Sequence, residues 1–414
     1  MRKPVFDICV IGFALFSMFF GAGNVIFPPY LGLGCGSSWF AGFAWYYLAD
    51  IGLALLAMFA ILRCGSTDKL MERIGAVPAK ILLTAITLCI GPMLAIPRTA
   101  ATTHEMALTP LVSGVSPVLF SVLFFALIFA MCVKQSAVVD IVGKLLTPAL
   151  LLGLLVLIVL GLLDPMGPLP TDRVLVESVA GTGIEAGYQT MDVLAAILFG
   201  IIIPKSAEDK GYSGKKKVSV VAGASLVAGG ALMAVYLGLT YLGATTSDFF
   251  DLSVQRSALM VAIVEDLMGK SGLWLFALIV ALACITTAAA LVSSSADFFS
   301  SLLKVSYQKM VLVMCVFSAV AANFGLDTIV SIAAPILNIV YPPTLVVVCM
   351  SFLEKWLPDH TAVRCAAAGA LVVSAAQTAG LWMALPLSAQ GFGWLVPAAV
   401  CGLVGFVIGR CKRA

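Results

Sequence analysis

Charged residues are scarce in this 414-residue chain, and so are the residue types that metal and nucleotide chemistry require. Asp, Glu, Lys and Arg together make up 11% of the sequence, whereas a soluble chain carries about 25%. It has two histidines, no C-x-x-C spacing among its eleven cysteines and no G-x-x-x-x-G-K stretch. These absences argue against a soluble protein, a histidine metal cluster and a phosphate-cradling loop. The net charge of +3 gives no reason to expect a nucleic-acid partner.

The chain is rich in long uncharged segments. Hydrophobic residues make up 61% of it and gather in long runs such as Ile8–Ala49, Val218–Ser247 and Cys365–Gly409. A membrane-spanning helix needs about 20 such residues. The first run follows Arg2 and Lys3, but it continues far beyond a signal-peptide core and ends at no small-residue cleavage site. The sequence therefore predicts an all-α polytopic membrane protein with an uncleaved first helix.

Breaks in the apolar runs divide the chain into about twelve expected membrane helices. With a cytoplasmic N-terminus, this count places all but four of the 24 Lys and Arg residues on the cytoplasmic side, as the positive-inside rule requires. The loop KSAEDKGYSGKKK at 205–217 is the strongest cytoplasmic marker. We expect a multi-pass protein of the cell (inner or plasma) membrane with both termini in the cytoplasm. The expected spans lie near 7–31, 39–63, 76–98, 117–133, 141–163, 187–204, 218–243, 272–300, 308–324, 328–353, 364–384 and 392–410.

No segment between these spans is long enough to form a separate domain. The longest segments, 164–186 and 244–271, are expected to be outer loops. The whole chain, 1–414, is therefore predicted to form a single membrane transport domain.

Asp192 is the one charge between Ala186 and Pro204, and a charge inside a membrane span is a candidate functional residue. It belongs to a polar cluster with Tyr188, Gln189 and Thr190 at the start of a short span that we expect to end at Gly200 and Pro204. An unwound helix here would present hydroxyls, carbonyls and a carboxylate to a cation or an ammonium group. The alternative is that Asp192 lies solvated at the outer membrane interface.

Two further charges interrupt apolar stretches. Asp50 lies in the second span, where it either bonds to a neighbouring helix or takes part directly in ion or proton binding. Arg98 follows Pro92 and Pro97 near the outer end of the third span. It is a candidate for an outer gate or an anion contact, or for an ion pair with Glu105 two helical turns later.

Thr286 and Thr287 are adjacent in a long uncharged span. Their hydroxyls are hard oxygen ligands that suit an alkali ion without adding a full charge. The alternative is that both hydroxyls bond back to their own helix, as Ser and Thr in membrane helices commonly do.

The stretch FFGAGNVIFPPY at 19–30 breaks the first span with two glycines, an asparagine and a proline pair. The sixth span is also interrupted and polar, and it holds the matching place if the chain divides into two halves of five spans. Paired interrupted spans point to the binding site of a transporter. Freed amides at a half-helix N-terminus can hold a carboxylate, and freed carbonyls can hold sodium. We expect Pro28 and Pro29 to mark the end of the outer half-helix.

These motifs resemble those of the branched-chain amino acid transport system II carriers, the leucine–isoleucine–valine cation symporter family. FALFSMFFGAGNVIFPPYLG is similar to the family's first-helix motif. GPMLAIPRTA, GYQTMDVLAAILFGIII, ACITTAAAL, ADFFSSL and YPPTLVVV look like further family motifs in the family's order. The resemblance covers nearly the whole chain, and the set of motifs is more specific than any one of them.

The resemblance implies a fold and an activity. The family belongs to the amino acid–polyamine–organocation superfamily, whose LeuT-type fold is a 5+5 inverted repeat with two C-terminal helices added. The repeats would be 1–163 (spans 1–5) and 187–353 (spans 6–10), followed by spans 11–12 at 364–410. The implied activity is sodium-coupled import of leucine, isoleucine and valine by alternating access, with no cofactor other than the coupling ion and no ATP-hydrolysing subunit.

The resemblance also suggests roles for residues. The amides of Ala22 and Gly23 would hold the substrate carboxylate, with Asn24 near an ion or the break itself. Thr190 would lie near the site, and Asp192, where related transporters have a serine, could pair with the substrate ammonium. Sodium would bind Thr286, Thr287 and carbonyls near Ser17 and Phe20. The remaining expected substrate contacts are Tyr188, Leu194, Ala195 and Leu291, and the gate candidates are Arg98 and Asp50.

Three other functions compete with sodium symport. A proton-coupled hydrophobic amino acid symporter would use Asp192 or Asp50. A membrane-embedded enzyme would need a nucleophile with a base or a metal set, and neither acid has a supporting motif. A substrate-sensing receptor would need an output domain, and the chain has no sizeable soluble segment.

Overall fold

Every regular element in the computed structural model is helical over the residues it describes, which are 4–112, 114–133, 147–357 and 359–412. By length and apolar composition, seven helical segments in these ranges are able to cross a membrane, and four shorter apolar helices accompany them. Each of the twelve expected spans contains a helix. Some predictions fall outside the described residues, namely the start of the fifth span at 141–146 and the basic residues Arg2, Lys3, Lys134, Lys144 and Arg413.

The first span consists of two helices, α1 (Pro4–Phe19) and α2 (Ala22–Cys35), with a break at Phe20 and Gly21. The break is packed tightly, because a Cβ added to Gly21 would lie 2.9 Å from Thr287 Cγ2. No side chain caps the N-terminus of α2, so its first amides keep no side-chain partner.

The prediction that Pro28 and Pro29 end the outer half-helix is wrong, since α2 continues through both to Cys35. Proline has no N–H, so the two prolines leave the carbonyls of Asn24 and Val25 without their usual helical donors. Just beyond them, α2 crosses α13 (Gly214–Ala244). A Cβ on Gly243 would lie 1.9 Å from the Pro29 carbonyl oxygen, so only glycine permits this crossing.

The sixth span is also two helices, α11 (Val179–Thr190) and α12 (Asp192–Asp209). Met191 joins them with φ at 68°, a left-handed conformation that a residue with a side chain rarely adopts. The break therefore lies at the polar cluster, as predicted. The expected end of the segment at Gly200 and Pro204 is wrong, because both residues lie inside α12.

Wide helical turns interrupt the second and third spans. The second span has a π-helical turn that contains Asp50, and the third has two such turns, the first of them with non-helical backbone at Gly91. Turns of this type are frequent at functional sites. In chain order the pieces are α3 (Trp39–Tyr47), the turn Leu48–Gly52, α4 (Leu53–Cys64), the short α5 (Thr67–Met71), α6 (Ala76–Leu88), the turn Cys89–Met93, α7 (Ala95–Thr102) and the turn Thr103–Leu108.

The eighth span belongs to α14 (Arg256–Leu303), which bends sharply at Gly269, where φ is 61°. The part before the bend, 256–268, is here named the loop helix. It lies within 244–271, which was expected to be only a loop. The part after the bend carries Thr286 and Thr287 into the centre of the bundle.

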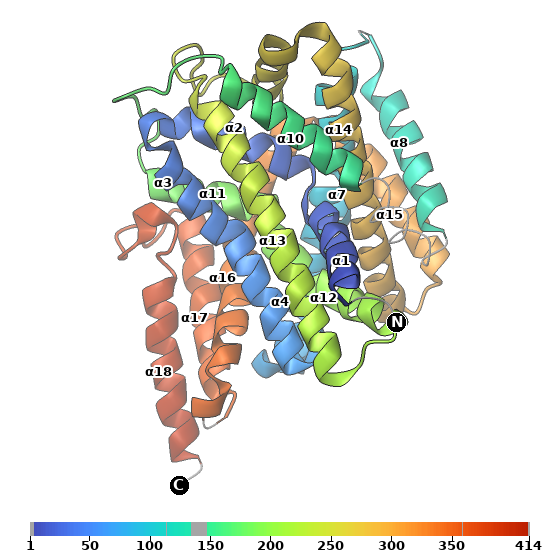
Figure 1. Ribbon diagram of the computed structural model, residues 1–414. Coiled ribbons are helices and arrows are strands. Elements are labelled where there is room, and N and C mark those ends of the chain that lie inside the picture. The colour runs from blue at the N-terminus through green and yellow to red at the C-terminus, as the bar shows by residue number, and fades with distance from the viewer. Residues whose placement is uncertain (1–3, 113, 134–146, 358, 413–414) are drawn as a thin grey trace.

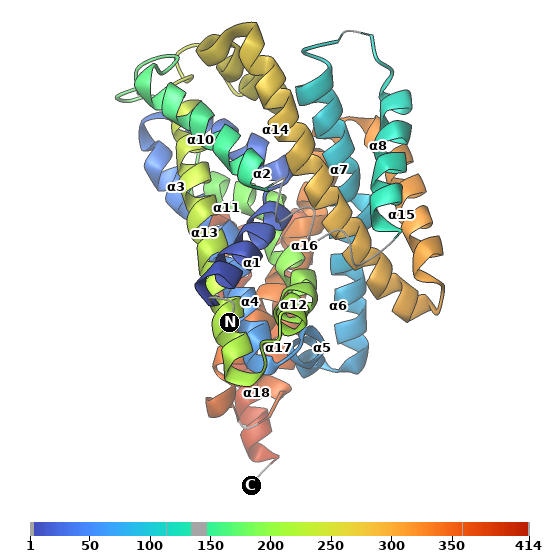
Figure 2. The same ribbon diagram turned by 45° about the vertical axis from the view of Figure 1, so that its right-hand side comes forward.

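The broken helices lie in the middle of the bundle, and the later helices surround them (Figure 1). α8 and α15 lie side by side at one edge, and α17 and α18 form the opposite, C-terminal edge (Figures 1 and 2). The remaining bounds are α8 (Pro117–Cys132), α10 (Thr147–Leu163), α15 (Tyr307–Ala321), α16 (Leu326–Phe352), α17 (Thr361–Thr378) and α18 (Leu395–Cys411).

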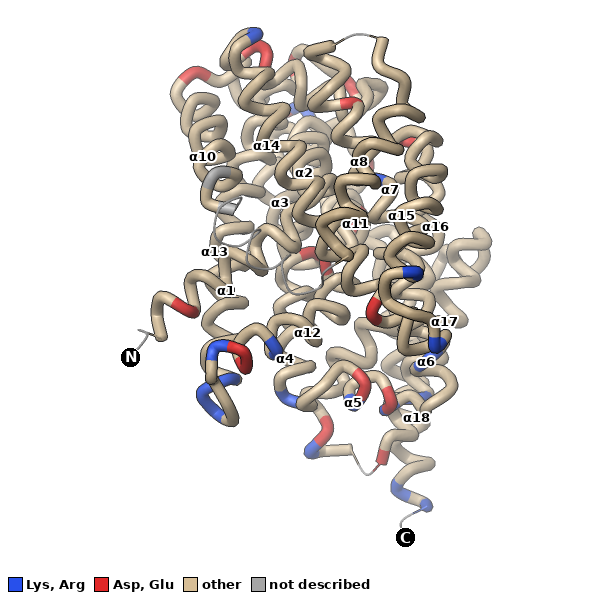
Figure 3. The backbone as a smooth tube through the Cα atoms, turned by 90° about the vertical axis from the view of Figure 1, so that its right-hand side faces the viewer, with Lys and Arg blue, Asp and Glu red and all other residues tan. Residues whose placement is uncertain are grey.

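The outer surface of the bundle suits lipid. On α8, for example, Leu119, Val122 and Leu123 are each more than half exposed, an arrangement that is stable in hydrocarbon and not in water. Lys and Arg gather toward the end of the bundle where α4, α5 and α18 lie (Figure 3). The protein is thus a multi-pass, all-helical membrane protein.

Candidate substrate and ion site

A small buried cavity lies where the two broken helices meet. Its walls come from the α1–α2 break, the α11–α12 break, the start of α7 and the middle of α14, and every lining residue is buried. Its volume is about 20 Å³, which is room for about one water molecule. The predicted site residues that line it are Ala22, Gly23, Asn24, Thr190, Asp192, Ala195, Thr287, Leu291 and Arg98.

Other predicted site residues lie outside this lining. Tyr188 stacks on Tyr341 with 4.3 Å between ring centroids, and Leu194 is fully buried. Asp50 lies outside the lining and contacts Thr190, which lines the cavity. Ser17, Phe20 and Thr286 belong to a separate group of oxygen atoms described below.

Asn24 connects the two breaks. Its side-chain amide donates to Asp192 Oδ2 at 2.9 Å and also to the Tyr236 hydroxyl. Asp192 is the first residue of α12, where the helix dipole stabilises a carboxylate. It is 3% exposed, so the alternative that it is solvated at the membrane interface is wrong.

Asp50 and Thr190 connect the second span to the sixth. The Thr190 hydroxyl lies 2.7 Å from Asp50 Oδ1 and 2.6 Å from the Gly187 carbonyl oxygen. Asp50 is fully buried, and its Oδ2 has no hydrogen-bond partner. The structure thus places Asp50 in contact with a neighbouring helix, beside the break.

Arg98 holds the end of α11. Its Nη1 donates to the Gln189 carbonyl at 2.6 Å and its Nη2 to the Thr190 carbonyl at 3.3 Å. A cation at a helix C-terminus satisfies free carbonyls and is favoured by the dipole. The ion pair between Arg98 and Glu105 that the sequence allowed does not form, because Glu105 accepts hydrogen bonds from other groups.

Five oxygen atoms gather between the α1–α2 break and α14. Thr287 Oγ1 lies 3.3 Å from the Ser17 carbonyl and 3.2 Å from the Phe20 carbonyl. Thr286 Oγ1 lies 3.4 Å from the same Ser17 carbonyl and 3.0 Å from the Ala283 carbonyl. We call these five atoms the oxygen cluster. Across the described part of the chain, no group of three or more His, Cys, Asp or Glu side chains is placed to hold a metal, so a cation here would bind neutral oxygens.

Sequence reasoning missed three partners in this site. Ala283 stands three residues before Thr286, the position to which a helical threonine back-bonds, so the motif could have identified it. Gln189 was noted only as part of a polar cluster, and its backbone carbonyl binds Arg98. Tyr236 comes from the long apolar α13, where nothing in a single sequence distinguishes it from a packing residue.

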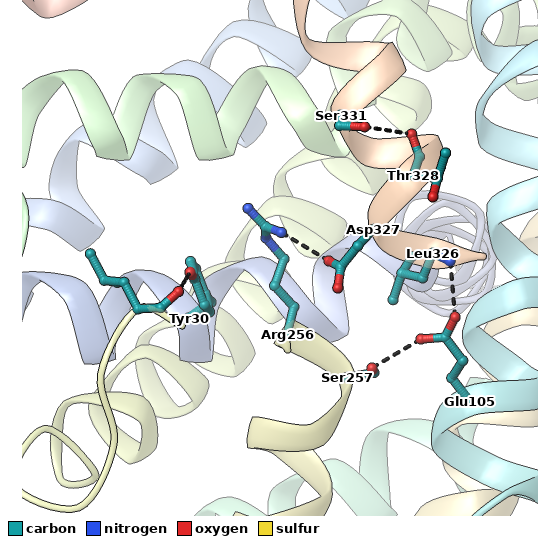
Figure 4. Close-up of polar contacts among 9 residues, drawn as sticks. Tyr30, Glu105, Arg256, Ser257, Leu326, Asp327, Thr328 and Ser331 are labelled. Carbon is teal, nitrogen blue, oxygen red and sulfur yellow. Dashed lines mark hydrogen bonds and ion pairs between the residues drawn. The ribbon is translucent and has the colours of Figure 1, made fainter. Parts of the chain in front are cut away.

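A second polar cluster joins the start of the loop helix to Glu105 and to the first residues of α16, beside Tyr30 of α2 (Figure 4). Arg256 pairs with Asp327 at 2.9 Å and lies 4.7 Å from the centre of the Tyr30 ring. Glu105 accepts from the Ser257 hydroxyl at 3.0 Å and from the Leu326 amide at 2.9 Å.

The loop that precedes this cluster is fixed by its own contacts. The Tyr30 hydroxyl donates to the Leu252 carbonyl at 2.7 Å. Asp251, which is exposed, accepts from the hydroxyl and the amide of Ser253, and these bonds hold the pKa of the Asp251 carboxyl below its usual value.

Two broken helices around one buried polar cavity, in a bundle of this size, define a secondary transport protein with a LeuT-type fold. A Na+-coupled sialic acid symporter in a substrate-bound outward-open state has a similar structure, with a TM-score of 0.68 over 98% of this chain and 90% of that one at 12% identity. MhsT in complex with L-phenylalanine has a TM-score of 0.60 over 96% of this chain and 98% of that one at 17% identity.

Sequence comparison identifies the family. The profile described as "Branched-chain amino acid transport protein" matches residues 4–412. The branched-chain amino acid permease BraB of Bacillus subtilis is 33% identical over 98% of this chain and 96% of its own length. The branched-chain amino acid transport system 2 carrier protein of Pseudomonas aeruginosa is 34% identical over the same shares. The chain belongs to the branched-chain amino acid transport protein family; it is a transport protein and not an enzyme.

Proposed function

We propose that this protein is a symporter that imports leucine, isoleucine and valine together with sodium by alternating access. The single observation that carries the ion assignment is the spacing of the oxygen cluster. Hydroxyl hydrogen bonds to oxygen are normally 2.5–3.0 Å long, and three of the four contacts here are 3.2–3.4 Å. Such spacing suits oxygens arranged around a shared cation better than it suits hydrogen bonds.

The number of hydroxyl protons in the oxygen cluster also favours a bound cation. Thr287 has one hydroxyl proton and two carbonyl neighbours, from Ser17 and Phe20. Thr286 also approaches the Ser17 carbonyl, and its single proton has the Ala283 carbonyl as a second neighbour. Two hydroxyl protons therefore face three carbonyl oxygens, and a buried carbonyl contact without a donor is costly. A sodium ion in contact with all five oxygens would coordinate the three carbonyls and both hydroxyls at once.

The position of the cluster supports coupling. Sodium bound there would connect the α1–α2 break to α14, and Thr287 also lines the cavity in which we place the substrate. An ion that stabilises the break in one conformation also raises the affinity for a substrate that needs this conformation, and the effect is reciprocal.

Substrate recognition follows from the same walls. The uncapped amides of α2 suit the carboxylate, and Asp192 beside Asn24 suits the ammonium group. Ala195 and Leu291 offer apolar surface to an aliphatic side chain. The proposed orientation has both termini and the 205–217 loop in the cytoplasm, and we keep 1–163 and 187–353 as the proposed repeats.

Uptake in proteoliposomes tests the proposal. Purified protein is reconstituted, and leucine accumulation is measured with an inward sodium gradient, with potassium in place of sodium, and with an inward proton gradient. We expect accumulation only with sodium. Accumulation that is unaffected by the loss of sodium and is driven by the proton gradient would contradict sodium coupling.

One observation favours proton coupling as the second candidate. The single proton of the Thr190 hydroxyl cannot serve Asp50 and Gly187 together, although both acceptors lie within 2.7 Å. A proton on the Asp50 carboxyl would let Asp50 donate to Thr190 while Thr190 donates to Gly187. Under this candidate, Asp50→Asn abolishes the response to the proton gradient, whereas under sodium coupling the variant keeps its sodium dependence.

A further inference from the structure

Arg98 brings an unused donor to the cavity. It is 3% exposed, it lines the cavity, and its Nε has no hydrogen-bond partner. Its Nη atoms are already held by the carbonyls at the end of α11. Among the residues that the structure describes, no ion pair joins Arg98 to a carboxylate. A buried guanidinium with a free N–H is unfavourable until an acceptor meets it.

The N-terminus of α2 faces the same place. A Cβ added to Gly23 would lie 2.8 Å from Arg98 Nη2, so the guanidinium packs directly against the first turn of this helix. The helix is 14 residues long, and no side chain caps it. Arg98 Cζ lies 5.6 Å from the centre of the Phe27 ring, a cation–π contact that helps to hold the guanidinium there. Two positive groups, a guanidinium and a helix N-terminus, therefore border one cavity.

We propose that Arg98 binds the carboxylate of the amino acid substrate, together with the first amides of α2. This inference rests on the proposed function and adds a specificity-determining residue to it. The forked guanidinium presents several donors, and charge-assisted bonds to a carboxylate are the strong ones. The ammonium group of the same substrate then has Asp192, at the first residue of α12, as its partner.

The present cavity volume sets a condition on this binding. About 20 Å³ does not admit an amino acid, so the broken helices must separate before the substrate enters. Arg98 belongs to α7, not to either broken helix. It therefore offers the substrate carboxylate a positive charge from a third element. The site then selects for a carboxylate and rejects an aliphatic amine that lacks one.

Ligands that lack one charged group at a time test this assignment. Dissociation constants are measured on purified protein in sodium for leucine, for 3-methylbutylamine (leucine without its carboxylate) and for 4-methylpentanoate (leucine without its amino group). Wild type, Arg98→Gln and Arg98→Lys are compared. Arg63→Gln is the control, because Arg63 also has a ring contact, with Phe352, but is exposed and remote from the cavity.

We expect Arg98→Gln to raise the dissociation constant of leucine about tenfold or more and to leave that of 3-methylbutylamine nearly unchanged. The preference for the carboxylate, which is the ratio of these two constants, then falls by the same factor. Lysine keeps the positive charge but lacks the forked donors of a guanidinium, so we expect Arg98→Lys to show an intermediate preference. Arg63→Gln should keep the wild-type preference. An equal loss for all three ligands, or a loss of preference for the amino group alone, overturns the proposal.

The lysine variant decides the matter if the glutamine variant does not fold, because a preference equal to wild type in Arg98→Lys also overturns the proposal. Wild-type protein that does not bind leucine at all contradicts the proposed function. Wild-type protein that binds leucine, with an unchanged carboxylate preference in the variants, contradicts only the role of Arg98.

Discussion

Thr287 belongs both to the oxygen cluster and to the lining of the central cavity. Its hydroxyl belongs to the oxygen cluster and lies 3.2 Å from the Phe20 carbonyl, while the residue also lines the cavity. Its Cγ2 lies 2.9 Å from where a Cβ of Gly21 would be, so the break closes directly onto it. A change at this residue is therefore expected to alter ion binding first and substrate binding through it.

Thr287→Ala removes one of the two hydroxyl ligands proposed for sodium. We expect the sodium concentration for half-maximal leucine uptake to rise about tenfold or more, since a lost polar partner in a buried site costs about 1–3 kcal/mol. Thr344→Ala is the matched control, because Thr344 is also a buried threonine, and it bonds back to the Val340 carbonyl of its own helix. A sodium dependence in Thr287→Ala equal to that of the control would remove Thr287 from the site.

Residue types together with the family resemblance predicted a good part of the candidate site, and contacts through space supplied the rest. Asp192, Asn24 and the threonine pair were recognisable because polar groups are rare inside spans. The partners of Arg98 were not, since the sequence offered Glu105 two turns away on the same segment. The carbonyls at the end of α11 became available only because that helix ends at Thr190. Every residue has a backbone carbonyl, so the residue type does not show which carbonyl is free.

Among the elements, the crossing of α2 and α13 depends on a glycine in each helix, since a Cβ on Gly32 would lie 1.9 Å from the Thr240 carbonyl oxygen. Gly243→Ala would place a methyl group 1.9 Å from the Pro29 carbonyl oxygen, so one of the two backbones has to move. We expect a loss of about 1–3 kcal/mol in the free energy of unfolding, measured as a lower thermal midpoint in detergent. Gly230→Ala in the same helix has open space around it and is expected to leave the midpoint unchanged or slightly raised.

The loop helix is connected to the bundle by a charge pair that can be tested by exchange. Arg256→Asp alone and Asp327→Arg alone each place like charges together beside α16, and we expect both to lower leucine uptake. The double exchange restores an attractive pair, so its uptake should exceed that of either single variant, as a double-mutant cycle measures. Uptake in the double variant no better than in the worse single variant would show that the pair does not hold the loop helix.

Helix boundaries were harder to predict than helix positions. A helix lies within each of the twelve expected spans, and among the described residues seven helical segments and four shorter helices have the apolar composition of a membrane span. The prolines of α2 and α12 suggested ends that do not exist, since a proline inside a buried helix costs hydrogen bonds that packing can offset. Conversely, Met191 gave no sign of a break, although its left-handed backbone is what separates α11 from α12.

For the whole molecule, the proposed orientation can be measured by labelling single introduced cysteines. Ser213 and Ser253 are both exposed and lie in loops near opposite ends of the long helix α13. In intact cells, a membrane-impermeant thiol reagent should label Ser253→Cys, and it should label Ser213→Cys only after permeabilisation. The unsubstituted protein provides the background, because Cys349 and Cys411 are also exposed. Labelling of Ser213→Cys in intact cells would reverse the orientation.

The smallness of the central cavity has an electrical consequence. Every residue that lines this cavity is buried, and its volume holds about one water molecule, so the cavity itself offers ions no continuous water path. A charge that crosses a resting membrane releases about 2.3 kcal/mol per 100 mV, and a carrier that leaked would waste this energy continuously. Under the proposed ion coupling, a cavity closed in this way prevents dissipation of the membrane potential between transport cycles.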